Sequence, residues 1–478
     1  MAYQPYIDPE YETLIERIYP PRVCIDNDQF RDCTLVKVDS ANKHGILLEM
    51  VQFLTDLDLV ISKSYICSDG GWFMDVFHVT DQLGNKLTDE SLILYIQQAL
   101  CASRRRGASK EIETCSIKRQ VKPRHVSTEN TALEITGTDS SGLLSEISAV
   151  LAELECHITA AAAWTHNNIT ACIIYVENGF PSGPISDPER LATVQEQLEN
   201  VVQACHGTEE NKSVSLTAPT AGRTHTERRL HQLMYSAVDY EPCCGCTGRG
   251  VGHRNSCSKI HVSIESCKEK GYSVVNMRCR DRPKLLFDTL CVLTDMQYVV
   301  FHAAVSSKGA MADQEYFIRQ KGGCTLDTES ERQELTQCLI AAIERRVSHG
   351  LRLDVCTNNR MGLLSDMTRV FRENGLSISR AEIGTHGDKA VGSFYVTDAS
   401  GYDVSQHTVE LVRKEIGGSV LVVNKSPGWT PKAPSISSSI SRTKTDSVDE
   451  EDKPRFSLGT LLWSQLERLS SNFGSIRS

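Results

Sequence analysis

Several features that mark common classes of protein are missing from this chain of 478 residues. Residues 1–8 hold no basic region followed by an apolar stretch, so we expect no secretory signal peptide. No apolar run reaches the ~18 residues that a membrane span requires, so we expect no membrane span. The formal net charge of −10 argues against nucleic acid as a partner. A general nucleic-acid binder needs a basic surface.

The signatures of common phosphate and nucleotide enzymes are missing as well. No Gly-Lys dipeptide occurs, so the chain has no Walker A phosphate loop, and no His-Asp dipeptide marks a metal-dependent hydrolase of that type. A nucleotidyltransferase places paired carboxylates shortly after a Gly-Ser turn. Every Gly-Ser dipeptide here lies far downstream of the pairs Asp26/Asp28 and Asp56/Asp58. We therefore expect a protein that is not an enzyme and carries no cofactor.

The 18 cysteines are scattered through helical, strand-like and loop segments. Without a secretory signal they indicate reduced thiols, which favours a cytoplasmic protein or, as the alternative, a nuclear one. The best metal candidate is a set of four residues: Cys243, Cys246, His253 and Cys257. Three thiolates and an imidazole can close a tetrahedral zinc site, but these spacings match no zinc module. We favour a loop of reduced thiols that holds no metal.

What the chain does contain is one six-residue motif in four copies. Residues 42–47 read Asn-Lys-His-Gly-Ile-Leu, and related motifs occupy residues 139–144, 281–286 and 359–364. Each copy follows a strand-like run and opens a run with helical apolar spacing. The motif is therefore a strand-to-helix turn, where unpaired backbone N–H groups can hold an anion.

Each copy is followed by a strand, a polar turn, a second strand and a second helix. The order strand, helix, strand, strand, helix, strand (βαββαβ) predicts an α+β fold of four ferredoxin-like modules. A single module leaves edges and a sheet face uncovered, so we expect the modules to pair through their sheets. The predicted second helices are residues 89–101, 187–204, 330–346 and 404–416, and a closing strand is predicted at 419–423.

The spacing of the motifs predicts the domain boundaries. A long gap separates the second and third copies, and a short helix is expected inside it at 230–238. The predicted parts are an N-terminal segment 1–33, module 1 at 34–110, module 2 at 127–206, an irregular Cys/Gly-rich insert at 207–258, module 3 at 259–346, module 4 at 349–426, a disordered Ser/Pro/acidic linker at 427–453 and a C-terminal amphipathic helix at 454–478. We expect that last helix to dock on protein.

The repeated turn with its helix and hairpin resembles the ACT domain. Four copies with an insert between the second and third resemble the plant ACT domain repeat family, which is similar to the C-terminal sensor region of bacterial uridylyltransferases. The runs at residues 20–27, 281–289 and 341–347 carry the resemblance. It implies a regulatory protein that binds free amino acids between paired modules and signals to a partner protein by changing how the modules pack. The alternative is an interaction scaffold whose pockets bind nothing.

The resemblance places the ligand at the repeated turn, and three copies keep its glycine. The amides of the turn suit the carboxylate of an amino acid, and an Asn or Asp oxygen suits its ammonium group. Glycine lets the backbone approach the ligand closely. The candidate ligand-binding residues are Asn42, His44, Gly45 and Ile46; Asp139, Ser141, Gly142 and Leu143; and Asn359, Met361, Gly362 and Leu363. The competing interpretation is that the Asn and Asp side chains only cap or order the turn.

The third copy departs from the pattern. Lys284 replaces the glycine, and Pro283 removes a backbone donor. Either this pocket is lost, which we favour, or Lys284 holds the anion directly. The sequence leaves open which amino acid binds, how many pockets are functional, and whether modules pair within one chain or between chains as a homo-oligomer.

Overall fold

A computed structural model of the chain places all four predicted modules in one unit, residues 1–426. It describes residues 21–42, 44–69, 71–102, 130–140, 142–179, 183–204, 213–217, 225–241, 260–323, 325–347, 350–386, 388–399, 401, 404–416 and 420–425. Ser141, the zinc candidates, the 427–453 linker and the C-terminal helix predicted at 454–478 lie outside the described residues.

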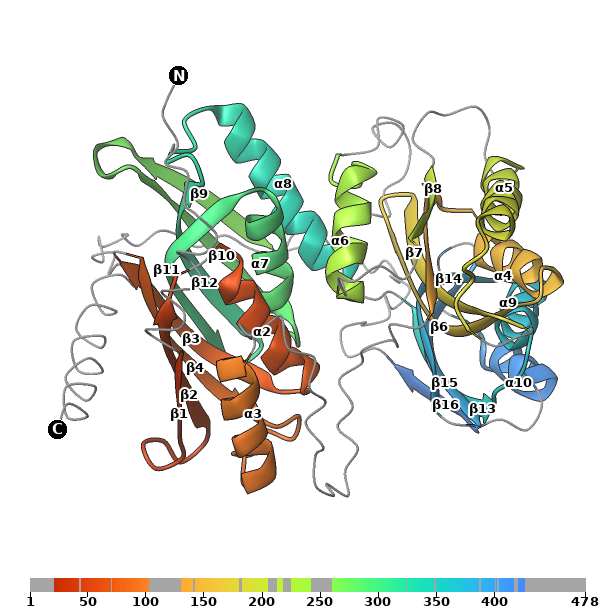
Figure 1. The fold of residues 1–478 in the computed structure, drawn as a ribbon, viewed down its shortest axis with the longest axis horizontal. Coiled ribbons are helices and arrows are strands. Elements are labelled where there is room, and N and C mark those ends of the chain that lie inside the picture. The colour runs from red at the N-terminus through yellow and green to blue at the C-terminus, as the bar shows by residue number, and fades with distance from the viewer. Residues whose placement is uncertain are drawn as a thin grey trace, which may run out of the picture. The chain divides into compact units, whose positions relative to one another are not determined.

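Modules 1 and 3 share one antiparallel sheet of eight strands (Figure 1). It joins them through β3 and β11, where Tyr65 pairs with Ala304 and Ile66 with Ala303. We call this junction the 1/3 seam. The elements of module 1 are β1 (Arg22–Asp26), β2 (Thr34–Ala41), α2 (Ile46–Asp56), β3 (Val60–Asp69), β4 (Trp72–Thr80) and α3 (Glu90–Ala102). Those of module 3 are β9 (His261–Cys267), a 3-10 turn (Lys268–Lys270), β10 (Tyr272–Arg280), α7 (Leu285–Asp295), β11 (Tyr298–Lys308), β12 (Met311–Gln320) and α8 (Glu329–Arg345).

Modules 2 and 4 share a second eight-stranded antiparallel sheet. Here β6 joins β14 at the 2/4 seam, where Ala162 pairs with Glu382. The elements of module 2 are β5 (Thr131–Thr138), α4 (Leu143–Glu153), β6 (Cys156–His166), β7 (Ile169–Asn178), α5 (Pro188–Ala204) and β8 (Ser213–Thr217). Those of module 4 are β13 (Leu351–Asn358), α9 (Leu363–Glu373), β14 (Leu376–His386), β15 (Lys389–Asp398), α10 (Gln406–Ile416) and β16 (Val420–Lys425). The predicted fold class, ferredoxin-like modules paired through their sheets, is confirmed.

The order of elements differs from the prediction in modules 1 and 3. Modules 2 and 4 follow βαββαβ and close with β8 and β16. In modules 1 and 3 the edge strand comes first, because β1 pairs with β2 and β9 pairs with β10. The edge of the first core strand needs a partner, and a strand from either direction along the chain can supply it. The segment 1–33 therefore contributes β1 to the first sheet.

The insert predicted as irregular also differs from the expectation. It contributes β8 to the second sheet and contains the helix α6 (Thr226–Ser236), which begins four residues before the predicted helix. Leu230, Leu233 and Met234 of α6 form an apolar cluster with residues of β6 and β7, among them Trp164 and Ile173. The same helix contacts α7 of module 3 (Figure 1). Thus α6 links the sheet of modules 2 and 4 to helix α7 of module 3.

Candidate functional site

The four copies of the motif form four bends of one geometry. The residues that cap α2, α4, α7 and α9 are Gly45, Gly142, Lys284 and Gly362, and their φ angles are 84°, 91°, 62° and 73°. Glycine adopts this left-handed conformation without strain, whereas another residue pays roughly 1–2 kcal/mol. The second and third amides of each helix have no acceptor in an ideal α-helix, so each bend can hold an anion.

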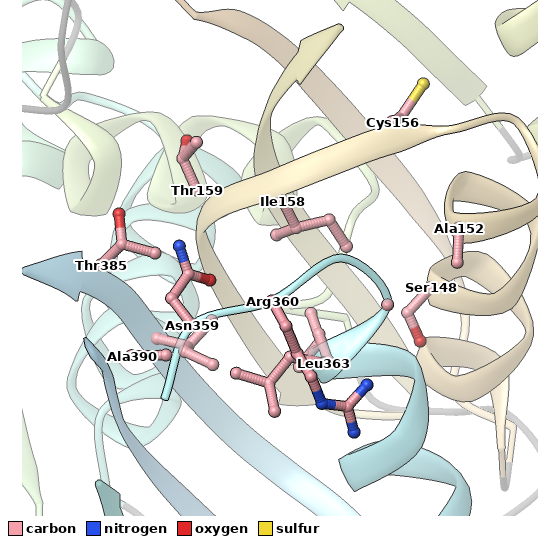
Figure 2. Close-up of a pocket in the computed structure, with 13 residues that line it drawn as sticks. Ser148, Ala152, Cys156, Ile158, Thr159, Asn359, Arg360, Leu363, Thr385 and Ala390 are labelled. Atoms are coloured by element: carbon pink, nitrogen blue, oxygen red, sulfur yellow. The ribbon is translucent and has the colours of Figure 1, made fainter. Parts of the chain in front are cut away.

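A pocket lies where the bend of module 4 meets module 2, and Figure 2 shows its lining. It encloses about 370 Å³, counting the part open to solvent. The Asn359 amide lies on the same side as Thr159 and Thr385, whereas the Arg360 guanidinium points away from them. We call it the Gly362 pocket. Its lining is Ser148, Ala152, Cys156, Ile158, Thr159, Asn359, Arg360, Gly362, Leu363, Leu364, Ile383, Thr385 and Ala390.

A second pocket lies at the same seam with the roles of the two modules exchanged. The bend of module 2 supplies Asp139, Ser140 and Gly142, and α9 and β14 of module 4 face it. This Gly142 pocket encloses about 500 Å³, again counting the part open to solvent. Its other lining residues are Leu143, Leu144, Ser145, Ala163, Thr165, Thr170, Thr368, Arg372, Leu376, Ser377 and Ile378. The modules of one chain complete both pockets, so neither requires a second copy.

The two pockets differ at the residue that faces the glycine. A Cβ atom added to Gly362 would lie 3.8 Å from the Cβ of Ala152, an ordinary contact. A Cβ atom added to Gly142 would lie 2.8 Å from the Cδ of Arg372, the residue of α9 that corresponds to Ala152 of α4. The guanidinium of Arg372 forms an ion pair with Glu146 in the first turn of α4. The Gly142 pocket is therefore flanked by charged groups, and the Gly362 pocket is open above its bend.

The polar side chains of the two bends also differ. Asp139 accepts a hydrogen bond of 3.1 Å from the hydroxyl of Thr170. The side-chain nitrogen of Asn359 lies 3.2 Å from Nε2 of His157, which suits an amide N–H donating to the imidazole. Because the nitrogen is used in this hydrogen bond, the side-chain oxygen of Asn359 is left to accept from another group. The candidate Met361 does not line the pocket: its side chain is exposed, and its terminal methyl group lies beside Gly179.

The bend of module 1 faces the C-terminal end of α7, as the bends of modules 2 and 4 face the C-terminal ends of α9 and α4. A Cβ atom on Gly45 would lie 3.8 Å from Cγ2 of Thr294. Burial lowers the pKa of His44, and the nearby Lys321 lowers it further. The backbone N–H of Asn42 donates to the backbone carbonyl of Gly71 and fixes the start of the bend. Ile46, the first residue of α2, is buried in the core.

The bend of module 3 is filled by a side chain of α6. The ammonium group of Lys284 lies 2.8 Å from each carboxylate oxygen of Glu227. Arg346 binds the same carboxylate at 3.1 and 3.2 Å. Lys284 therefore does hold an anion, but the anion belongs to this chain.

The predictions from sequence missed the buried charges around this bend. Asp288 receives two hydrogen bonds of 2.7 Å from Arg346 and an ion pair of 2.7 Å from Arg282. His231 of α6 lies 2.9 Å from Asp288 and 3.1 Å from Arg345. An arginine can only donate, so Nδ1 of His231 accepts and Nε2–H donates to Asp288. The runs 281–289 and 341–347 contain Asp288 and the three arginines, but neither run indicates that they meet each other or His231.

Comparison with known proteins gives the family. The ACR family N-terminal ACT domain matches residues 29–107, and the ACT domain matches residues 352–417. ACT domain-containing protein ACR1 of Arabidopsis thaliana is 57% identical over 485 residues, which cover 100% of this chain and 99% of that protein. The chain belongs to the ACT domain-containing ACR family. ACR4 of the same plant is 46% identical over 478 residues and is covered completely, as is this chain.

The family assignment confirms the resemblance inferred from the motifs, and the names of these ACR relatives state their domain content without a catalytic activity. A bifunctional uridylyltransferase/uridylyl-removing enzyme of Azospirillum brasilense is 37% identical over 81 residues, which cover 17% of this chain and 9% of that enzyme. The similarity to this enzyme is thus limited to a short part of both chains.

The described residues add three findings. None of their helices combines the length and the apolar character needed to cross a membrane. No group of three or more His, Cys, Asp or Glu side chains in the described ranges is arranged to bind a metal ion. Each cysteine in these ranges is a free thiol.

Proposed function

We propose that this ACR-family protein is a non-catalytic regulatory protein that binds a free amino acid at the 2/4 seam. The observation that carries the proposal is that two pockets lie on two of the predicted bends, Gly142 and Gly362, and that each is completed by the opposite module. The position of both pockets at a junction between modules suits a ligand that changes how modules pack.

The Gly362 pocket suits a small, uncharged amino acid. The backbone amides of Leu364 and Ser365 would hold a ligand carboxylate, because they are the second and third of α9 and have no acceptor in an ideal helix. The Asn359 oxygen would accept from the ligand ammonium. Ile158 and Ile383 supply apolar contacts for a short side chain, and the one charged lining residue, Arg360, points away in Figure 2.

Binding would stabilise the 2/4 seam, because the ligand would contact the bend of one module and the helix and strand of the other. We propose that a partner protein reads this change, in the cytoplasm or the nucleus. The alternative function is a scaffold with pockets that bind nothing. The pockets are small and narrow, so a ligand search decides between the two.

Isothermal titration and thermal-shift assays against the twenty amino acids test the proposal. At least one amino acid should give heat of binding and raise the melting temperature, and Gly362→Ala should weaken that binding. Gly375→Ala is the matched control, because Gly375 has a φ of 70° at the other end of α9 and a Cβ there meets nothing within 4 Å. No heat and no thermal shift with any amino acid would favour the scaffold.

A further inference from the structure

The strongest feature outside the 2/4 seam is the carboxylate of Glu227, in the first turn of α6. Its side chain is only 13% exposed, and it lies between two cations from separate parts of module 3, Lys284 and Arg346. Burial alone would raise the pKa of Glu227, but Arg346 and Lys284 outweigh burial and hold it below the ordinary value. The carboxylate is therefore ionised and held by at least four polar contacts.

The groups around this carboxylate are held in fixed positions by further contacts. Arg346 is oriented by its bidentate contact with Asp288, whose side chain is fully buried. The guanidinium carbon of Arg346 also lies 5.1 Å from the centre of the Trp164 ring, on the opposite sheet. An arginine fixed on two sides in this way keeps its remaining donors aimed at one point.

The location of the site matches that of the other bends. Lys284 caps α7 at the position that Gly142 and Gly362 occupy in α4 and α9. A lysine in the left-handed conformation is strained, and its contact with a carboxylate offsets that strain. Module 3 thus has a cation, bound to a carboxylate, at the position where modules 2 and 4 have glycine.

We propose that the bend of module 3 is a carboxylate-binding site and that Glu227 of α6 is its resident ligand, supplied by the chain itself. In this arrangement α6 fastens the sheet of modules 2 and 4 to module 3 in the same way that a bound acid would. The class of ligand that the site takes is a small monocarboxylate. The proposal goes beyond amino-acid binding at the 2/4 seam and does not depend on it.

Chemical rescue tests the proposal directly. Glu227→Ala leaves a space that acetate fits, because the deleted atoms are a methylene group and a carboxylate. The variant should melt roughly 5–10 °C below the parent chain, since Lys284 loses this carboxylate and Arg346 keeps only that of Asp288. Sodium acetate should restore at least half of that loss in a saturable manner, and sodium chloride at the same ionic strength should not.

Two further variants keep the test decisive. Glu227→Ala with Lys284→Met removes a cation of the site, so acetate should no longer raise its melting temperature above the effect of chloride. Glu134→Ala breaks the other bidentate ion pair of α6, with Arg229, whose side chain is 36% exposed, so no acetate-specific rescue is expected there.

The proposal would be overturned by a Glu227→Ala variant as stable as the parent, or by equal effects of acetate and chloride. If that variant folds only in acetate, the proposal is supported. Glu227→Gln fills the site with a neutral group, and it should lower the melting temperature without any response to acetate. Stability of Glu227→Gln equal to that of the parent would also count against the site.

Discussion

The two seams have one architecture and opposite contents. Both join two ferredoxin-like modules edge to edge, and both bring two helices together, α2 with α7 and α4 with α9. At the 2/4 seam both bends border pockets, whereas at the 1/3 seam the bend of module 3 holds Glu227; the bend of module 1 faces Thr294, at the position that Ala152 holds opposite Gly362. A repeated bend therefore does not imply a repeated pocket, because the residues facing the bend decide its role.

The same contrast appears six residues after each cap. At the 2/4 seam these positions are Ser148 and Thr368, whose hydroxyl oxygens lie 2.9 Å apart in the buried core. The corresponding residues at the 1/3 seam are Val51 and Leu290, which are buried in its apolar core. The 2/4 seam thus has a polar pair at these positions, and the 1/3 seam has an apolar one.

The largest effect is expected from breaking the ionic cluster around the bend of module 3. Asp288→Asn leaves Arg346 and Arg282 without their buried counterion, which should lower the free energy of unfolding by about 3–5 kcal/mol. Asp366→Asn changes the corresponding residue of module 4, which is partly exposed, and should change it by less than ~0.5 kcal/mol. Urea denaturation measures both, and equal losses would remove the contrast between the seams.

A smaller effect is expected from pH, because two histidines border this cluster with opposite shifts. Burial lowers the pKa of His231, and Arg345 and Arg346 lower it further against the hydrogen bond to Asp288. Burial would also lower the pKa of His166, but hydrogen bonds to Asp239 and Glu344 outweigh burial and raise it. The folded state thus favours a neutral His231 and a charged His166.

The sign of each contribution follows from these directions. The stability from His231 is complete above its unfolded pKa of about 6.5 and is lost as the pH falls through its folded pKa. The stability from His166 is complete below about 6.5 and is lost as the pH rises through its folded pKa. Urea denaturation from pH 5 to 9 measures both contributions. His231→Gln should reduce the loss of unfolding free energy at acid pH, and His166→Gln should reduce the loss at alkaline pH. Unchanged pH profiles in both variants would contradict the assignment.

The pockets can be compared by exchanging the residues that face their glycines. Ala152→Arg introduces into the Gly362 pocket the side chain that borders the Gly142 pocket, and it should weaken binding there about tenfold, or 1.4 kcal/mol. Arg372→Ala should leave the Gly362 pocket unchanged and enlarge the Gly142 pocket. Titration calorimetry gives the affinity and stoichiometry of each variant. Full affinity in Ala152→Arg would place the ligand elsewhere.

The smallest effect is expected at the polar centre of the 2/4 seam. Ser148→Ala should cost about 1 kcal/mol, because it removes one partner of the Thr368 hydroxyl, which keeps its hydrogen bond to the carbonyl of Leu364. Adding Thr368→Val should recover part of the loss, since a methyl group then replaces the buried hydroxyl that faced the Ser148 side chain. A double-mutant cycle by urea denaturation measures the coupling. Strictly additive losses would show that the two hydroxyls act independently.

Much of the fold could be predicted from the sequence because the signals were local and repeated. The helix predicted at 187–204 is α5, Pro188–Ala204, and the helix predicted at 330–346 is α8, Glu329–Arg345. The pairing of module 1 with module 3 could not be predicted, because β3, β6, β11 and β14 all present the same backbone N–H and C=O groups at their edges. For the same reason Ala152 and Arg372 gave no signal as pocket residues.

The contents of the third bend were unpredictable for a different reason. Lys284 marked the bend as unusual, but its partner Glu227 lies 57 positions earlier in the chain, in a segment with little periodicity. Only the fold brings the two together. The candidate residues Asn359, Gly362 and Leu363 line one pocket, and Asp139, Gly142 and Leu143 line the other; their role in binding stays a prediction.

The interleaved pairing has a consequence for synthesis on the ribosome. Ser68 of β3 donates to the carbonyl of Phe301 in β11, 233 positions later. At about 5–20 residues per second, module 1 waits about 10–50 s with a bare strand edge before its partner has been made. Module 2 is translated in that interval and offers β6, an equally bare edge. A nascent chain must therefore keep the edges of β3 and β6 apart until β11 and β14 have been synthesised. Pairing of β3 with β6 at that stage would compete with productive folding.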